Sequence, residues 1–319
     1  MTMERTAVLL MAYGGPLSLD DVEPYLLDVR GGRPTPPELI EEVRERYALI
    51  GGQSPLLAWT QRQARALEGA LRDAYPEMRV FVGMRHWHPY IREVVPEMVA
   101  SGVEHLVAIP MAPHYSKMSV GAYRKALEEA LAAYENPPRV SFVERWGTEP
   151  AFVETVAENV RRTLERFPAE VRPSVAVVFT AHSLPRRVVE MGDPYPIELE
   201  KSSALVAEAA GVKEWLFAYQ SAGASSVPWL GPDVGEVVQE LAEQGREHVL
   251  VVPIGFVCDH VEILYDIDIE LKGIADRVGV HLERTPSLND SPGLIRALKS
   301  LVERHLTTAE VQERDDVRA

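Results

Sequence analysis

The feature that most constrains the fold is an alternation of short apolar, β-branched runs with longer amphipathic stretches along the whole chain. Continuous apolar strands separated by helices of roughly 10–15 residues are typical of a parallel sheet with helices on both faces. We therefore expect an α/β fold. The expected strands are Ala7–Ala12, Val80–Gly83, His105–Ile109, Arg139–Val143, Val175–Thr180, Trp215–Tyr219, His248–Pro253 and Gly279–Glu283. The expected helices are Thr60–Ala74, Tyr90–Ala100, Ala122–Tyr134, Pro150–Arg166, Ser202–Ala210, Pro232–Glu243 and a last one that ends near His305.

An internal repeat is the second feature. The segment that starts at Gly102 (Gly-Val-Glu-His-Leu-Val-Ala-Ile-Pro) is echoed at Gly245 (Gly-Arg-Glu-His-Val-Leu-Val-Val-Pro). The opening strand before Tyr13 is likewise echoed by the strand that ends at His182. Any two strand–helix units look alike, but the shared Gly-x-Glu-His and Pro favour a duplication. We expect two similar halves, residues 1–146 and 147–306, and a polar, frayed tail at residues 307–319.

Charge and cysteine content exclude several functions. The formal net charge of −15 argues against nucleic-acid binding, which needs a basic surface. Such a charge favours the approach of a divalent cation, whereas an anionic organic substrate would need a local group of arginines. The single cysteine, Cys258, excludes an intrachain disulfide framework and a four-cysteine iron–sulfur or zinc site. We expect that cysteine simply to be buried.

No stretch of the sequence resembles a membrane anchor or a secretion signal. The longest apolar run, Val249–Cys258, contains Pro253 and Gly255 and falls well short of the roughly 18 residues that cross a bilayer. The run Ala7–Ala12 is too short for a signal peptide. We therefore expect a cytoplasmic protein.

The ends of the expected strands are where a ligand site is most probable, because open parallel sheets bind ligands beyond the carboxyl ends of their strands. Polar groups of metal-ligand or acid–base type follow three strands: Tyr13 follows the first, His182 the fifth, and a segment that reaches Glu262 the seventh. The pair Gly14–Gly15 indicates a tight turn, because neither a dinucleotide fingerprint nor a Walker A sequence is present.

The most informative pattern follows the seventh strand. Glu262, Asp266 and Glu270 are spaced by four, so a helix would stack their carboxylates on one face. A solvated face is the commoner meaning of that spacing, and like charges four apart destabilise a helix by roughly 0.2–0.5 kcal/mol per pair. The segment nevertheless follows the most buried-looking strand and has no lysine before Lys272. We interpret these three residues as an acidic ladder that passes cations or protons toward a site.

His182 is the candidate partner of the acidic ladder, because it lies at a strand end opposite the acidic segment. A lone histidine is more often structural, but a neutral imidazole can bind a metal or take a proton near neutral pH. His86 and His88 would share one face of an extended chain, although no third ligand is adjacent to them. His114 and His260 also follow strand ends and are secondary candidates.

Four arginines form a basic patch near the N-terminus of an otherwise acidic chain: Arg30, Arg33, Arg44 and Arg46. The patch is either ordinary surface charge or a site for an acidic substrate. The second interpretation is plausible because a guanidinium group pairs with a carboxylate through two parallel hydrogen bonds.

Seven segments make the chain similar to the ferrochelatase family. They occur in the family's order over roughly residues 7–305, and seven in register are not explained by chance. The segments are Leu10-Met-Ala-Tyr-Gly14, Arg46-Tyr-x-x-Ile-Gly-Gly-x-Ser-Pro55, Ala112-Pro-His-Tyr-Ser116, Ala181-His-Ser-Leu-Pro185, Gly192-Asp-Pro-Tyr195, Trp229-Leu-Gly-Pro-Asp233 and Gly255-Phe-x-x-Asp-His-x-Glu-x-Leu-Tyr265.

The resemblance implies two similar Rossmann-like domains of the chelatase type, each a parallel sheet flanked by helices, with a porphyrin cleft between them. It also implies an enzyme that inserts Fe²⁺ into a porphyrin. The family's catalytic metal pair maps onto His182 and Glu262, and its acidic helix face onto Asp266 and Glu270. Its porphyrin contacts map onto Tyr13, Arg30, Arg46, Tyr47, Ser54 and Tyr123.

The porphyrin itself is suggested by Tyr13. A tyrosine there, in a chain without a membrane anchor, resembles the Gram-positive-type enzymes that convert coproporphyrin III to coproheme; the alternative substrate is protoporphyrin IX, which gives protoheme. Gly31 replaces a second basic residue of some relatives, and Arg85 stands where a lysine often precedes the cleft residue His86. Three rival functions remain open: a cobalt–sirohydrochlorin chelatase of the same fold, a tetrapyrrole carrier and a two-lobed solute-binding protein.

The resemblance also implies the cofactor and the partners. Iron is a substrate, no resident cofactor is expected, and the cysteines that bind a [2Fe–2S] cluster in some members are missing. We expect a monomer of heme biosynthesis that spans no membrane and makes transient contact with a downstream enzyme of that pathway.

Overall fold

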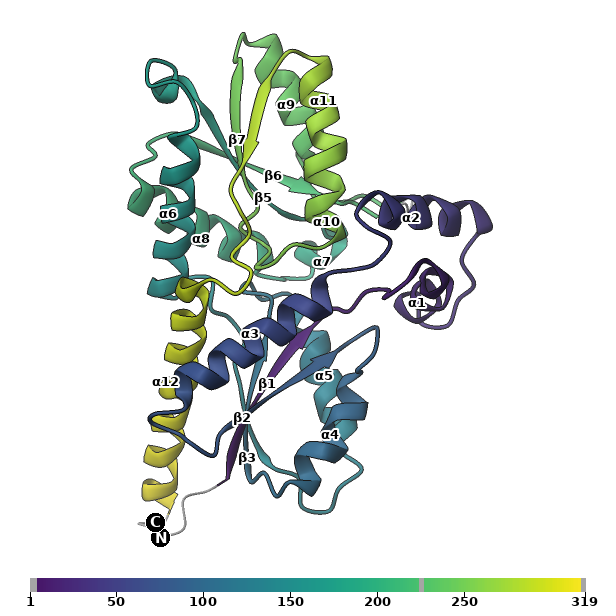
Figure 1. Cartoon of the computed structure of the whole chain (residues 1–319), viewed down its shortest axis with the longest axis vertical. Helices are drawn as coiled ribbons and strands as arrows, with labels where there is room; N and C mark the ends of the chain where they lie inside the picture. The colour runs from purple at the N-terminus through teal and green to yellow at the C-terminus, as the bar shows by residue number, and fades with distance from the viewer. Residues whose placement is uncertain (1–4, 224–226, 317–319) are drawn as a thin grey trace.

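Two parallel sheets of four strands each make up the framework of the computed structural model, which describes residues 5–223 and 227–316. Figure 1 shows one sheet above the other along the long axis of the molecule. The first sheet has the order β2-β1-β3-β4 and the second the order β6-β5-β7-β8. The strands are β1 (Thr6–Ala12), β2 (Arg79–Met84), β3 (His105–Pro110), β4 (Arg139–Phe142), β5 (Ala176–His182), β6 (Trp215–Gln220), β7 (His248–Val252) and β8 (His281–Arg284).

The two sheets have the same strand order, so the two halves are similar, as a duplication would predict. Strands β1 and β5 hold the second position in their sheets, and β3 and β7 hold the third. Both sequence echoes fall on these equivalent strands, since His105 begins β3 and His248 begins β7. The α/β class with two similar Rossmann-like halves is therefore as predicted. The boundary between residues 146 and 147 falls between β4 and the next helix and stays a prediction.

Helices cover both faces of the first sheet because successive strand residues point to opposite sides. Val8 and Leu10 of β1 pack toward α3, whereas Leu9 and Met11 pack toward α4 and α5. All four side chains are fully buried, so the strand reads as a continuous apolar run, as a two-sided parallel sheet requires. The three helices are α3 (Leu56–Leu71), α4 (Ile91–Ala100) and α5 (Val120–Leu131).

The second sheet is covered in the same way. Phe179 of β5 packs on the side of α6, α8 and the C-terminal helix, and its neighbour Val178 packs on the side of α9 and α11. The elements of this half are α6 (Pro150–Leu164), η2 (Arg172–Ser174), α7 (Arg186–Glu190), α8 (Tyr195–Ala210), α9 (Val234–Glu243), α10 (Val261–Leu264), the π-helix η3 (Asp266–Leu271) and α11 (Lys272–Arg277).

Two helices of the first half stand apart from these layers. Figure 1 shows α1 (Val22–Val29), which follows the short turn η1 (Leu19–Asp21), and α2 (Pro37–Leu49) projecting to one side where the two halves meet. Few of their residues are buried, and Tyr47 is the buried residue of α2. The projection brings α2 beside the segment that carries the acidic ladder.

The C-terminal helix α12 (Pro292–Asp316) contacts α6 of the second half and α3 of the first. We expected this helix to end near His305 and a frayed tail to follow, and that helix end was wrong. Residues 309–314 read Ala-Glu-Val-Gln-Glu-Arg, which is rich in strong helix formers and extends the helix. Residues 317–319 of the expected tail, and residues 1–4 before the first strand, lie outside the described residues.

Candidate active site

His182 is the last residue of β5 and is half-buried. Its Nδ1 lies 2.5 Å from the carbonyl oxygen of Ser183, and the hydroxyl of Tyr195 donates to the carbonyl of His182 at 3.2 Å. A carbonyl can only accept, so Nδ1 carries a proton in this contact. In a neutral ring the lone pair is then at Nε2, where it is available to a metal or a proton.

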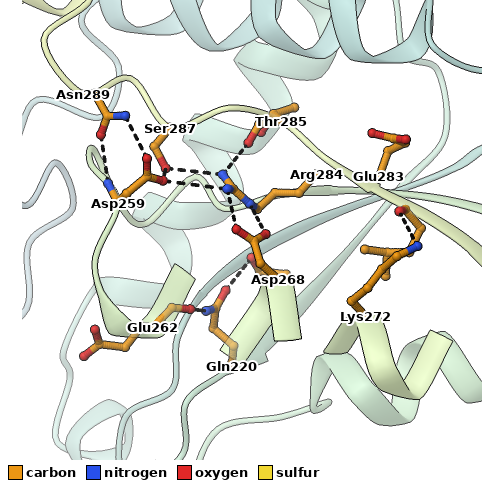
Figure 2. Close-up of polar contacts among 12 residues, drawn as sticks. Gln220, Asp259, Glu262, Asp268, Lys272, Glu283, Arg284, Thr285, Ser287 and Asn289 are labelled. Atoms are coloured by element: carbon orange, nitrogen blue, oxygen red, sulfur yellow. Dashed lines mark hydrogen bonds and ion pairs between the residues drawn. The ribbon is translucent and has the colours of Figure 1, made fainter. Parts of the chain in front are cut away.

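Gln220 connects His182 to Glu262. It ends β6 as the register partner of His182, and its Nε2 donates to the backbone carbonyl of Glu262 at 2.7 Å (Figure 2). The Thr180 hydroxyl donates to the Oε1 of the same amide at 2.7 Å and fixes its orientation. Our sequence reasoning missed Gln220, although a polar residue at the end of an apolar strand beside His182 was a readable signal.

Gly255 lets the loop after β7 approach the end of β5. A β-carbon at this position would lie 2.6 Å from the Cβ of Ala181, closer than real side-chain contacts allow. Only a glycine therefore permits the chain to pass beside His182 before it turns into α10 and presents Glu262. The close approach gives a physical reason for the Gly-Phe start of the motif at this strand exit.

His260, a secondary candidate from the sequence, belongs to the site. Its Nε2 lies 3.1 Å from Oε2 of Glu262, and its Nδ1 lies 2.8 Å from the carbonyl oxygen of Cys258. The ring therefore bridges the loop backbone and the Glu262 carboxylate. Cys258 is buried in an apolar cluster with Leu56 and Met84, and burial raises the pKa of its thiol, so the expected simple burial is confirmed.

The acidic ladder lies on a helix that is not uniformly α-helical. We expected a regular helix, but α10 ends at Leu264 and the π-helix η3 follows. The amide of Glu270 donates to the carbonyl of Tyr265, five residues earlier, at 2.9 Å. Glu262 is half-buried, Asp266 is buried, and Glu270 is exposed, so the three carboxylates lead from the strand end to the surface. Such π-turns are rare and occur frequently at functional sites.

Asp266 is the most perturbed carboxylate of the ladder. Burial raises the pKa of Asp266 to about 6, and the charge of Glu262 adds to the rise, whereas the Ser221 hydroxyl bond and Arg46 oppose it. Ser221 donates to Oδ2 of Asp266 from a left-handed backbone conformation with φ 59°. A serine in that conformation is uncommon, and sequence reasoning carried no signal for it.

The tyrosines of the first half face this ladder. The pKa of Tyr13 is raised to about 12 by burial, although the residue as a whole is 37% exposed, and the negative charge of Glu262 adds to the rise. Burial and Glu262 likewise raise the pKa values of Tyr47 and Tyr123, both of which are buried. Tyr25, which the sequence did not single out, hydrogen-bonds Tyr47 and has a raised pKa for the same reasons. The negative charge of Glu262 thus acts on all three predicted tyrosines.

Ser54 lies beside the turn that follows β1. Its amide donates to the carbonyl of Pro16 at 2.7 Å, and its hydroxyl oxygen is 3.3 Å from the amide of Leu56. A β-carbon at Gly15 would lie 2.5 Å from that hydroxyl and 3.5 Å from the Tyr47 hydroxyl. The predicted residues Tyr13, Tyr47 and Ser54 therefore surround one glycine turn.

Only Arg46 of the basic patch contacts the acidic ladder. Its Nη1 lies 3.6 Å from Oδ1 of Asp266. Arg44 pairs with Glu41 on its own helix at 2.9 Å, and Arg33 donates to the carbonyl of Arg30 at 3.0 Å. The patch is thus divided. Arg46 contacts the ladder, Arg44 lies on the solvent side of its helix, and Arg30 is the residue that follows the last turn of α1.

The remaining histidines do not form a metal site. His86 lies 2.7 Å from Asp28, and the exposed His88 lies 2.9 Å from Glu93, so the two rings pair with separate carboxylates. His86 instead packs against the Tyr13 ring at 4.6 Å between centroids. His114 is fully buried, and its ring nitrogens hydrogen-bond no described group. Throughout residues 5–223 and 227–316, no group of three or more His, Cys, Asp or Glu side chains is arranged to hold a metal ion.

Comparison with known proteins decides the family. The sequence profile of the ferrochelatase family matches residues 5–306. This chain belongs to the ferrochelatase family. The chain is 44% identical to a ferrochelatase of Herpetosiphon aurantiacus, over 93% of this chain and 98% of the relative. It is 40% identical to the coproporphyrin III ferrochelatase of Anoxybacillus flavithermus (96% and 98% covered) and 39% identical to that of Bacillus subtilis (95% and 98% covered).

Solved structures confirm the chelatase-type fold. The sirohydrochlorin chelatase SirB from Bacillus subtilis subspecies spizizenii has a TM-score of 0.59 at 16% identity, over 97% of this chain and 98% of that one. SirB from Bacillus subtilis has a TM-score of 0.60 at 14% identity with the same coverage. This likeness extends over both halves, as a chelatase-type pair of domains requires. In the part of the chain that the structure describes, no helix has the length and apolar character of a membrane span.

Proposed function

We propose that this ferrochelatase inserts Fe²⁺ into coproporphyrin III to give coproheme, with His182 and Glu262 as the catalytic pair. The observation that carries the proposal is that Gln220, the strand partner of His182, donates to the backbone carbonyl of Glu262, whose charge also acts on Tyr13 of the first half. Iron is a substrate in this reaction, no resident cofactor takes part, and the enzyme acts as a cytoplasmic monomer in heme biosynthesis.

Metal insertion requires the loss of two pyrrole protons and the delivery of a cation to the ring nitrogens. The Nε2 lone pair of His182 and the carboxylate of Glu262 are suited to accept those protons or to bind the metal transiently. Asp266, with a pKa of about 6, exchanges protons readily near neutral pH and links Glu262 to the exposed Glu270. The incomplete ligand set suits a metal that must be released to the porphyrin.

Two arginines are placed to bind the acidic side chains of the porphyrin. The Nε atoms of Arg30 and Arg46 are buried, and neither hydrogen-bonds a described protein group. Buried donors in native proteins nearly always have an acceptor. A propionate of the substrate would supply one, because a carboxylate accepts from a guanidinium group in a two-point contact. Tyr13 and His86 would border the ring between these anchors.

Coproporphyrin III is favoured over protoporphyrin IX for two reasons. Relatives of this chain from Anoxybacillus flavithermus and Bacillus subtilis are named coproporphyrin III ferrochelatases. Coproporphyrin III also carries propionates where protoporphyrin IX carries vinyl groups, and a site with several arginines favours the more anionic ring. Protoporphyrin IX is the alternative, since the Herpetosiphon relative is named only a ferrochelatase.

A tetrapyrrole carrier is the rival from a different class. A carrier needs the arginines but has no use for a histidine and a glutamate whose positions are fixed by Thr180, Gln220 and Tyr195. Such supporting contacts are expected around catalytic or metal-binding side chains rather than around a passive ring-binding surface.

Anaerobic turnover with Fe²⁺ tests the proposal. Coproporphyrin III and protoporphyrin IX are offered separately, and metalation is followed by absorbance. A preference for coproporphyrin III supports the proposal, and a preference for protoporphyrin IX keeps the catalytic pair but rejects the substrate. The variant His182→Ala should bind porphyrin without metalating it; normal turnover in that variant rejects the assignment of His182. Tight binding without metalation by the wild type would favour the carrier.

A further inference from the structure

Arg284, at the end of β8, makes a two-point ion pair with the π-helix. Its Nε lies 2.7 Å from Oδ1 of Asp268, and its Nη2 lies 2.8 Å from Oδ2 (Figure 2). Its Nη1 donates to the carbonyl of Thr285 at 2.9 Å, so the guanidinium group is held in place by its own backbone as well. The Arg284 side chain is 15% exposed, which limits screening of the pair by solvent.

Asp259 lies on the other side of the same guanidinium group, at 3.8 Å. The Ser287 hydroxyl donates to Asp259 at 2.7 Å, and the Asn289 amide donates to it at 2.9 Å. Asn289 in turn accepts from the backbone amide of Asp259 at 2.9 Å. This two-way contact forms although Asn289 has a left-handed backbone conformation with φ 47°, which asparagine tolerates better than most residues. We call Asp259, Asp268, Arg284, Ser287 and Asn289 the Arg284 cluster.

The Arg284 cluster joins the loop before Glu262 to the π-helix that carries Asp266. Asp259 lies three residues before Glu262, in the loop that also carries His260. Asp268 lies two residues after Asp266, within the π-helix. The cluster therefore fixes the loop that presents Glu262 relative to the helix that presents Asp266, through contacts separate from those of Ser221 and Arg46.

A π-turn needs such a support more than an α-helix does. The amides of Ile269 and Glu270 both reach the carbonyl of Tyr265, at 3.1 and 2.9 Å, so the backbone bonds alone do not select one register. Two side-chain contacts favour the observed register. Asp268 pairs with Arg284, and Asp266 accepts from Ser221. A shift to the α-helical register would turn the Asp266 carboxylate away from Glu262.

The same cluster is attached to the first half of the molecule. The backbone carbonyl of Asn289 accepts from the Gln63 amide of α3 at 2.8 Å, and the neighbouring Asp290 pairs with Arg62 at 2.8 Å. These contacts therefore connect the loop that presents Glu262 to the first half, which carries the tyrosines, as well as to its own sheet.

We propose that Arg284 is a positioning residue for metal insertion, because it holds the loop of Glu262 and the π-helix of Asp266 in one fixed arrangement. Arg284 touches neither the porphyrin nor the metal in this role. The inference rests on the proposed function in that Glu262 takes part in metal insertion and Asp266 supports it. Supporting residues of this kind typically affect metal affinity or activity by about 10- to 100-fold.

The test compares three variants of the full chain. Arg284→Gln removes the charge and the two-point contact, and Arg284→Lys keeps the charge but cannot form both bonds with Asp268. Lys272→Gln is the matched control. Lys272 begins α11 directly after the π-helix and joins it to β8 through the carbonyl of Leu282 at 3.3 Å, but hydrogen-bonds no member of the Arg284 cluster among the described residues. Metalation of coproporphyrin III is measured at varied Fe²⁺, together with porphyrin binding by fluorescence.

Arg284→Gln should raise the KM for Fe²⁺ by about 10- to 100-fold while porphyrin affinity stays at the wild-type value. The KM for Fe²⁺ of Arg284→Lys should lie between those of the wild type and Arg284→Gln, and that of Lys272→Gln should match the wild type. A KM for Fe²⁺ that does not change in Arg284→Gln, or that rises only in step with lost porphyrin affinity, overturns the proposal. If Arg284→Gln does not fold, Asp268→Asn keeps the shape of the pair and is held to the same criteria, with a smaller rise.

A binding measurement separates this proposal from the proposed function. If the wild type metalates neither porphyrin, the proposed function fails, but Co²⁺ titration followed by visible absorption still reports the arrangement of the ladder. Weaker Co²⁺ binding in Arg284→Gln than in the wild type and Lys272→Gln supports the positioning role. Equal Co²⁺ binding in all three proteins overturns it.

Discussion

Arg46 and Asp266 come from opposite halves of the molecule, and the guanidinium Nη1 of one lies 3.6 Å from the carboxylate Oδ1 of the other. The same guanidinium group pairs with Glu42 at 2.7 Å and stacks over the Tyr265 ring at 5.0 Å. Arg46 is therefore shared between a helix of the first half and the acidic ladder of the second. In the proposed reaction, a porphyrin carboxylate bound to Arg46 would compete with Asp266 for the guanidinium group.

Arg46→Gln should move the acid limb of the pH profile of metal insertion to higher pH. Arg46 lowers the pKa of Asp266 against the effect of burial, so its removal raises that pKa above about 6. The protonated form then persists to higher pH, and the limb should move by about half a unit, the size of a partly exposed ion pair. The control is Arg44→Gln, which removes a cation paired only with Glu41. An acid limb at the wild-type pH in Arg46→Gln would contradict the expectation.

Gln220→Leu should lower both stability and turnover. The change leaves the Thr180 hydroxyl and the Glu262 carbonyl without their partner, which costs about 1–3 kcal/mol of unfolding free energy. Turnover should fall by about 10-fold or more, because the Glu262 backbone loses its fixed position. Gln220→Glu separates the two bonds, since it still accepts from Thr180 but cannot donate to Glu262. Urea unfolding and steady-state metalation are the measurements, and wild-type turnover in Gln220→Glu would show that the Glu262 bond is dispensable.

Much of the fold could be predicted from the sequence because the strands are buried on both faces. The run Val8–Met11 is apolar at every position, and the echo of His105 at His248 identified equivalent strands. Strand and helix ends shifted by a few residues, as at β5, which ends at His182 rather than Thr180. The end of α12 was misjudged because helix-forming residues continue past the last apolar ones.

The site could be predicted only in part. His182, Glu262, Asp266 and Tyr13 were identified because they follow strands or repeat at a helical spacing. The π-helix was not predicted, since the contact of Asp268 with Arg284, 16 residues later on β8, cannot be read from the sequence. The side chain of Gln220 hydrogen-bonds the backbone of Glu262, and such a contact has no sequence motif that would predict it. Carboxylates four residues apart in the sequence are compatible with both an α-helix and a π-helix. The sequence therefore could not show which of the two conformations this segment adopts.

Gly14→Ala should destabilise the protein more than Gly31→Ala, although both glycines have positive φ angles, 95° and 65°. Each substitution strains the backbone by about 1–2 kcal/mol. A β-carbon at Gly14 would in addition lie 2.8 Å from the backbone nitrogen of Trp87. A β-carbon at Gly31 would have no described atom within 4 Å beyond its chain neighbours. We expect Gly14→Ala to cost about 1–3 kcal/mol more in urea unfolding and to weaken porphyrin binding through the adjacent Tyr13. Equal losses in the two variants would show that the contact with Trp87 relaxes freely.

His114 should make the stability of the protein depend on pH below neutrality. Burial lowers the pKa of this histidine to about 3, and its ring nitrogens bond no described group. The unfolded chain binds the same proton with the ordinary histidine pKa of about 6.5. Between these two values the unfolded state holds more protons, so the folded state loses stability as the pH falls below about 6.5, and above that pH the contribution is fully present.

His114→Leu should remove this part of the pH dependence. One titrating group costs about 1.4 kcal/mol per pH unit in this range, so the wild type should lose about 2 kcal/mol more than the variant between pH 7.5 and pH 5. The variant should be no less stable at pH 7.5, because it replaces a buried polar ring that has no described partner by an apolar side chain. His88→Leu, which removes an exposed histidine, serves as the control for general effects of losing an imidazole. Urea unfolding at the two pH values measures the difference, and equal losses in the wild type and His114→Leu would mean that the folded protein accommodates a protonated His114.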